Sequence, residues 1–284
     1  MMKKLFIALQ LILPQHFLSA CMHKAARCET VWFKNAFIKF IVNKYKVNLD
    51  EAAESDPESY DSFNAFFTRE LTEGARSFDD DNTTLASPVD GTVSQAGVID
   101  NSEIFQAKGK SFNLSALVGS SELAKDFEGG HFTTIYLSPK DYHRIHFPSD
   151  ATLTKMVHVP GDLFSVNPTT TEAIDGLFAR NERVISFFDT PAGPMAMVMV
   201  GAIFVSSIET IWQGEVTPPR HNQIRFWDYN DKKLAYKKND EMGRFNMGST
   251  VVLLYGKDAI EWDEKLTPGK VVRLGETIAK VIEK

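Results

Sequence analysis

The chain has 284 residues, 43% hydrophobic and 24% charged, so it can bury a sizeable core like an ordinary globular protein. Its two cysteines, Cys21 and Cys28, form neither a disulfide framework nor the spacing of a zinc site, which favours a reducing compartment. Residues 1–46 carry eight Lys/Arg against one Asp/Glu, a net charge of +7, while the remaining residues carry 23 against 36, a net charge of −13, which argues against a nucleic-acid surface on the main body.

The first segment, MMKKLFIALQLILPQHFLSACMHK, combines two lysines with a short apolar run from Leu5 to Leu13. The tetrad that ends at Cys21 imitates the processing site of a lipoprotein signal. However, the residues at 14–16 interrupt the run before that point, and the run is far shorter than the roughly 20 residues that cross a bilayer. A retained segment is therefore favoured, with a noncatalytic lipoprotein anchored through Cys21 as an alternative.

The next segment, ETVWFKNAFIKFIVNKYK, places aromatic and aliphatic residues at helical spacing with lysines between them. Trp32, Phe37 and Phe40 belong to this pattern. A basic, aromatic helix is typical of a segment that lies on an anionic membrane surface. The alternative is that the same apolar stripe packs on the protein core.

After this segment the sequence predicts one more short helix and then mostly strands. SDPESYDSFNAFFTREL begins with capping residues and predicts a short helix, and a polar linker follows from Asp79 to Thr84. Beyond it come the short apolar or β-branched runs GTVSQAGVI, HFTTIYL, ATLTKMVHV, RVISFFD, MAMVMVGAIFVSSIETIW and STVVLLY. We therefore expect an α+β protein: a helical, membrane-docking region over residues 1–80, followed by a β-rich, largely antiparallel catalytic body over residues 81–284.

Reactive side chains occur beside three predicted turns. Asp90 stands between Val and Gly in SPVDGTV, His143 and His146 stand three apart in SPKDYHRIHFP, and Ser249 follows Gly248 in MGST. An aspartate, a histidine and a serine can form a relay in which the carboxylate orients the imidazole and the imidazole removes the hydroxyl proton. The histidine pair lacks the glutamate of the HExxH zinc pattern, so we expect no metal. A standing hydrolase triad that acts on lipid esters is one alternative.

A longer series of motifs resembles the bacterial phosphatidylserine decarboxylase proenzymes over nearly the whole chain. The series consists of SFNAFFTREL, PVDGTVSQAG, QAKGKSFNLSALVG, YLSPKDYHRIHFP, VPGDLFSVN, LFARNERVISFFDT, VGAIFVSSIETIW, TPPR and EMGRFNMGST. The family more often has leucine where this chain has Met247, a volume-conserving difference from which we expect little effect.

The resemblance implies that the chain cuts itself between Gly248 and Ser249. Ser249 would attack the carbonyl of Gly248, and elimination and hydrolysis would convert Ser249 into a covalent pyruvoyl cofactor. The products would be a β chain, residues 1–248, and an α chain, residues 249–284. In this interpretation Gly248 permits a strained, close approach, His146 acts as the base and Asp90 holds its tautomer.

The resemblance also implies the reaction and its setting. Phosphatidylserine would bind the pyruvoyl group as a Schiff base, lose CO2 and leave as phosphatidylethanolamine, with His143 as the candidate proton donor. Because a two-tailed lipid stays in the bilayer, we expect a peripheral protein on the cytoplasmic face of the inner membrane. The family further implies a homodimer.

Overall fold

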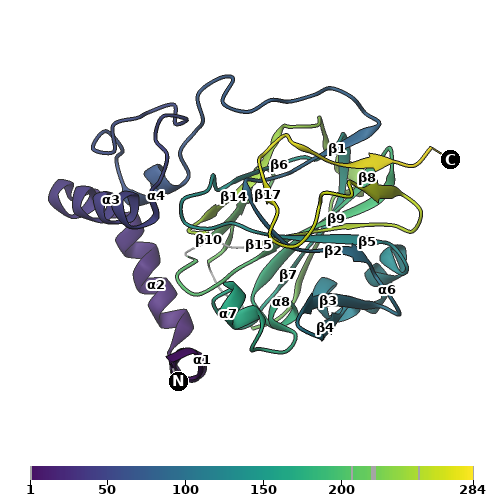
Figure 1. Cartoon of the computed structure of the whole chain (residues 1–284), viewed down its shortest axis with the longest axis horizontal. Helices are drawn as coiled ribbons and strands as arrows, with labels where there is room; N and C mark the ends of the chain where they lie inside the picture. Colours follow the sequence, from purple (N-terminus) through teal and green to yellow (C-terminus); the bar gives the residue numbers. More distant parts are fainter. Residues whose placement is uncertain (1, 206, 219–221, 249, 284) are drawn as a thin grey trace.

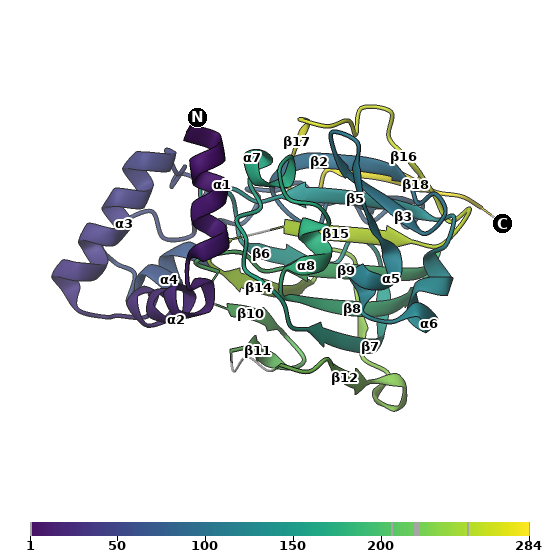
Figure 2. The ribbon, with the colours of Figure 1, turned by 90° about the horizontal axis from the view of Figure 1, so that it is seen from below.

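The longest helices come first in the chain, and the strands follow them. The computed structural model describes residues 2–205, 207–218, 222–248 and 250–283. The N-terminal helices are α1 (Met2–Ile12), α2 (Gln15–Ala26), α3 (Val31–Tyr45) and α4 (Phe63–Phe67). They lie at one side of a body made mostly of strands, as Figures 1 and 2 show. The expected α+β architecture with largely antiparallel sheets is therefore confirmed.

Helix α3 has one packed face and one open face. Ile38 and Ile41 are three residues apart, so they share a face, and both are buried against the phenylalanines of α4. Ser62 starts α4 by accepting a hydrogen bond from the backbone of Ala65. On the other face of α3, Trp32 and Phe40 are 74% and 56% exposed. One face thus packs on the protein, while the other leaves aromatic side chains open.

Helices α1 and α2 attach to the body through buried polar side chains. Gln10 and Gln15 are 3% and 9% exposed, although both interrupt an apolar sequence. The side-chain oxygen of Gln10 accepts a hydrogen bond from the Ser165 amide at 2.7 Å, and that of Gln15 accepts one from the Leu163 amide at 2.6 Å. Processing at Cys21 would remove both contacts.

The described helices give little sign of a membrane span. No single one of them is long and apolar enough to cross a bilayer. The residues Phe6–Ile12 and Gln15–Ala26 reach the required length and apolar character only together, and the two segments are bent by 89°.

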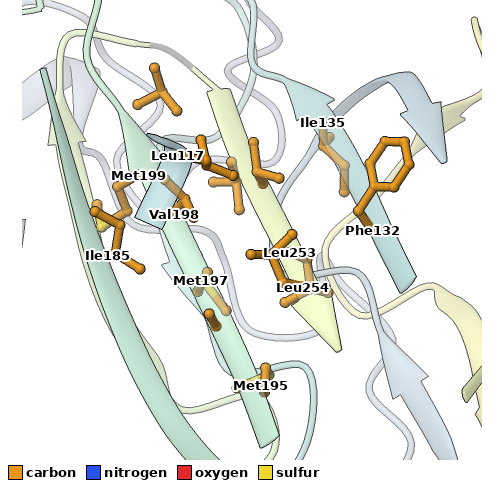
Figure 3. Close-up of a cluster of buried hydrophobic side chains, with 14 of the residues drawn as sticks. Leu117, Phe132, Ile135, Ile185, Met195, Met197, Val198, Met199, Leu253 and Leu254 are labelled. Carbon is orange, nitrogen blue, oxygen red and sulfur yellow. The ribbon is translucent and has the colours of Figure 1, made fainter. Parts of the chain in front are cut away.

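The main sheet contains a strand that begins just after the predicted cleavage point. Its order is β12 (Arg225–Asp228), β7 (Ala151–Val159), β8 (Arg183–Thr190), β9 (Gly193–Val200), β15 (Thr250–Tyr255), β5 (His131–Tyr136), β2 (Gly91–Val98) and β17 (Val271–Val272), with β13 (Ala235–Tyr236) paired to β7. Strand β15 pairs along its full length with β9 on one side and β5 on the other, and all of its residues are buried. Figure 3 shows Leu253 and Leu254 of β15 in the core beside β9 and β5.

Smaller elements complete the body. A second sheet has the order β11 (Gly214–Thr217), β10 (Ser207–Thr210), β14 (Glu241–Asn246) and β6 (Arg144–His146); a third has the order β1 (Thr84–Ala86), β18 (Thr277–Val281) and β16 (Ile260–Trp262); and β3 (Glu103–Ala107) pairs with β4 (Lys110–Asn113). The short helices are α5 (Leu114–Val118), α6 (Ser121–Ala124), η1 (Lys125–Phe127), α7 (Pro168–Thr171), α8 (Leu177–Arg180) and η2 (Asn230–Lys232). Consecutive strands β14 and β15 belong to different sheets, so residues 247–249 connect the two. A domain boundary at residue 80 stays a prediction.

Candidate active site

The candidate site lies at this connection between two sheets. Ser249 itself is outside the described residues, but Gly248 and Thr250 flank it. Met247 has a φ of 88°, a left-handed conformation that is uncommon for a residue with a side chain. Gly248 is not left-handed, so the backbone strain expected at the glycine falls on Met247 instead.

Gly248 is needed for space rather than for a left-handed turn. A Cβ built on it would lie 2.6 Å from Nε2 of His143, which is closer than real Cβ contacts come. His143 is fully buried and its ring centroid lies 4.0 Å from that of Phe67 on α4. The structure therefore brings His143 directly against the residue before Ser249, with α4 behind it.

The hydrogen bonds of His143 assign its tautomer. Its Nδ1 lies 2.7 Å from the carbonyl oxygen of Asp141, to which it donates. Nε2 is buried and has no hydrogen-bond partner among the described residues. Burial, followed by the positive charge of Arg69, lowers the pKa of His143 to about 3. A neutral imidazole with a free lone pair on Nε2 thus faces Gly248.

His146, at the end of β6, is held in a different way. Its Nδ1 lies 2.7 Å from the carbonyl oxygen of Asn239, and its Nε2 lies 3.3 Å from the hydroxyl of Tyr142. Burial raises the pKa of Tyr142 to about 12, so this hydroxyl stays protonated and can donate to Nε2. Burial also lowers the pKa of His146. The tautomer of His146 is fixed here by Asn239, a role that the sequence interpretation gave to Asp90.

Asp90 is bound by an arginine that the sequence interpretation missed. One carboxylate oxygen accepts hydrogen bonds from Nε of Arg76 at 3.0 Å and from the backbone of Leu274 at 2.8 Å, and the other forms an ion pair with Nη2 of Arg76. The backbone amide of His146 donates to Pro88, two residues before Asp90. The structure therefore places the His146 backbone beside the Asp90 segment, while the hydrogen bonds of the described residues do not join the two side chains.

An apolar pocket of about 380 Å³ opens beside Gly248. Its lining includes Phe6 of α1, Ile41 of α3, Phe67 of α4, Tyr136 of β5 and Val205. These residues come from segments far apart in the sequence. The sequence therefore showed that they are apolar, but not that they line one pocket. The pocket can hold hydrocarbon next to the connection between the sheets.

Several histidines and acids lie near this connection, but they do not form a metal centre. Within the described ranges, no group of three or more His, Cys, Asp or Glu side chains is arranged to hold a metal ion. Beside Gly248 the structure places the neutral imidazole of His143 and an apolar pocket, whereas β6 pairs His146 with Glu241, seven residues before Gly248.

The depressed pKa of His143 predicts acid sensitivity. Between about pH 6.5 and about pH 3 the unfolded chain binds a proton at this position that the folded chain does not, so the free energy of unfolding falls as pH is lowered through this window. Replacing His143→Gln should make this fall shallower. Urea unfolding of the wild-type protein and the variant at pH 7 and pH 5 measures the difference, and equal pH dependence would contradict the assignment.

Comparison with known proteins identifies the family of the chain. A family model described as phosphatidylserine decarboxylase matches residues 63–280, and a second model, described as PSD, matches residues 5–46. Curated proteins named phosphatidylserine decarboxylase proenzyme are 52% identical in Methylococcus capsulatus (96% of this chain, 95% of the relative), 52% in Shewanella loihica (99% and 100%) and 48% in Idiomarina loihiensis (99% and 97%). A match of this extent, over both the helices and the β-rich body, means that the chain belongs to the phosphatidylserine decarboxylase family.

Proposed function

We propose that this protein converts phosphatidylserine to phosphatidylethanolamine and CO2 after cutting itself between Gly248 and Ser249. The observation that carries the proposal is the fit of the buried imidazole of His143 against Gly248, immediately before a strand that is pinned on both sides. Membership of the family supports the same reaction. The products of the cut are residues 1–248 and residues 249–284.

The cut itself needs only groups of the chain. Ser249 Oγ attacks the carbonyl carbon of Gly248 as a base takes the hydroxyl proton, and the peptide bond becomes an ester. Removal of the α-proton of residue 249 then expels the Gly248 carboxylate and leaves a dehydroalanine, which hydrolyses to a pyruvoyl group and ammonia. Atoms balance with one water consumed in the hydrolysis, and Gly248 becomes a new carboxyl terminus.

Basicity distinguishes the two histidines. An efficient general base has a pKa near the working pH, and a pKa of about 3 makes His143 a weak base in the uncut chain. We therefore keep His146 as the proposed base, its imidazole held by Asn239 and Tyr142. Because β6 pairs His146 with Glu241, seven residues before Gly248, this role requires the connection between the sheets to approach His146. Asp90 stays in the proposal as the adjacent carboxylate, and a direct bond to His146 requires its ion pair with Arg76 to open.

The surroundings of Gly248 suit a pyruvoyl group at the next position. Nε2 of His143 is a buried polar atom without a partner in the described part of the chain, and the apolar pocket adjoins Gly248. When formed, the pyruvoyl group supplies a ketone for the substrate amine and accepts the electron pair left by CO2. His143 would deliver the proton that replaces CO2, since opening of the chain at Gly248 exposes its imidazole and lets its pKa rise. The apolar pocket would exclude water and hold hydrocarbon of the lipid.

Membrane attachment is the last part of the proposal. Residues 1–46 carry a net charge of +7, and Trp32 and Phe40 are exposed on α3 beside lysines. These features support peripheral attachment to the anionic cytoplasmic face of the inner membrane. The homodimer that the family implies remains a proposal as well.

Ser249→Ala should leave one chain and make no ethanolamine lipid, since the attacking oxygen and the source of the pyruvoyl group are both lost. Intact mass under denaturing conditions gives the number of chains, and Ser94→Ala on β2 is a matched control that should still be cut. Cleavage of the Ser249→Ala protein would contradict the mechanism. A single wild-type chain that a fluorophosphonate labels at Ser249 would instead favour the lipid-ester hydrolase.

The two histidine variants should fail at different steps. His146→Ala should slow the cut about 100-fold or more, the usual effect of losing a general base. His143→Ala should still be cut but lose a similar factor in decarboxylation, measured as CO2 released per cleaved chain. Normal turnover by cleaved His143→Ala would remove this residue from proton transfer, and blocked cleavage in that variant would move the base role to it.

Trp32→Ser combined with Phe40→Ser should weaken vesicle binding about tenfold or more, because each aromatic side chain contributes a few kcal/mol of apolar burial at a membrane. Flotation with anionic vesicles measures the effect. Phe105→Ser combined with Phe226→Ser, two exposed residues of the body, is the matched control. Substitutions are preferable to deletion of the N-terminal helices, because deletion would also remove the hydrogen bonds of Gln10 and Gln15 to the β-rich body. Equal binding by both pairs would exclude the docking role.

A further inference from the structure

A second cavity, of about 220 Å³, adjoins the apolar pocket but has a different character. Its lining contains five cationic residues and three carboxylates, namely Lys46, Arg69, Arg76, Lys140 and Arg273 with Glu51, Asp90 and Asp141. We call it the cationic cavity. Tyr45 and Pro139 line the apolar pocket, and the next residues in the chain, Lys46 and Lys140, line the cationic cavity, so the same two segments form walls of both spaces.

The carboxylates of the cationic cavity are already engaged. Arg76 pairs with both Asp90 and Glu51, and Arg273 pairs with Glu51 at 3.0 Å. The carboxylate of Asp141 accepts hydrogen bonds from the backbone amide and the hydroxyl of Ser138, at 2.7 and 2.8 Å. Within the described part of the chain, Lys46, Arg69 and Lys140 are left without an ion pair.

Arg69 is the most unusual of these cations because it is only 5% exposed. Its Nη2 donates to the carbonyl oxygen of Lys140 at 3.2 Å, and its guanidinium lies 5.4 Å from the ring of Phe66. Nε and Nη1 are buried without a hydrogen-bond partner among the described residues. Burial lowers the pKa of Arg69, and this effect outweighs the opposing influence of Tyr60, Asp90 and Asp141, none of which forms an ion pair with it in the described part of the chain.

We propose that the cationic cavity binds a phosphate group. A phosphate carries several charged oxygens, so it can accept hydrogen bonds from two lysines and compensate a buried arginine at the same time. Lys46 and Lys140 are exposed at the rim, where they can attract and hold the anion, while Arg69 provides a fixed positive charge below them. The phosphate belongs either to a soluble phosphate ester or to a phospholipid whose hydrocarbon occupies the neighbouring pocket. The positive charge of the cavity and the burial of Arg69 support this site, and neither depends on the proposed decarboxylation.

The test is calorimetric titration of inorganic phosphate into the full-length protein in a maltoside detergent. The wild-type protein should bind phosphate with an affinity that falls as salt is raised. Lys46→Gln combined with Lys140→Gln should weaken binding about tenfold, because both changes remove charge-assisted hydrogen bonds. Lys233→Gln combined with Lys265→Gln removes the same charge from exposed positions outside the cavity and should change the affinity less than about twofold.

Two results would overturn the proposal: no saturable phosphate binding by the wild-type protein, or equal loss in the two double variants. Arg69→Gln should bind least, and the rim variants decide the question if that buried change prevents folding. Repeating the titration with protein bound to vesicles of phosphatidylglycerol and phosphatidylcholine identifies the source. If the vesicle-bound protein no longer binds inorganic phosphate, a lipid phosphate occupies the cavity. If it still binds inorganic phosphate, the ligand is a soluble phosphate ester. Since no arm measures cleavage or decarboxylation, the outcome is independent of the proposed function.

Discussion

The double pairing of β15 is the constraint on which the rest of the site depends. This strand is joined to β9 and β5 along all six of its residues and is buried on both faces. The 36-residue piece that the proposed cut would release from residue 249 onward is too short to hold a core of its own, and it would keep its place only because the larger piece surrounds this strand. Thr250 is therefore fixed by the main sheet, whereas Asn246 ends a strand of the second sheet.

The same arrangement explains why the helices matter to the chemistry. Helix α4 places Phe67 against His143, and α1 and α3 supply walls of the apolar pocket. The buried amides of Gln10 and Gln15 fix the helices to the loop at 163–165, which lies next to that pocket. The N-terminal region is thus both the part with exposed aromatic residues and the part that shapes the space beside Gly248.

Local sequence patterns predicted the elements well, because period and capping are local properties. The helical spacing of Trp32, Phe37 and Phe40 indicated α3, and the unbroken apolar run of β15 indicated a buried strand. The importance of the Gly248 neighbourhood also followed from the motif that contains it. The partners of its side chains did not: the Arg76 ion pair of Asp90 and the Asn239 carbonyl that holds His146 are set by tertiary packing. A main-chain carbonyl leaves no trace in residue identity, and one arginine among many carries no signal of its partner.

The left-handed backbone of Met247 has a consequence for the direction of the proposed cut. Such a conformation costs on the order of 1–3 kcal/mol, and the intact chain maintains it because strands on both sides of the connection are fixed. Once the bond after Gly248 is broken, Met247 is the second residue from a free end, and its φ can return to an ordinary value. Rejoining the ends would have to restore that unfavourable geometry. In the proposed mechanism this strain would favour opening of the chain over rejoining by up to about a hundredfold. The elimination that consumes Ser249 is the step that would separate the two pieces and make the cut irreversible.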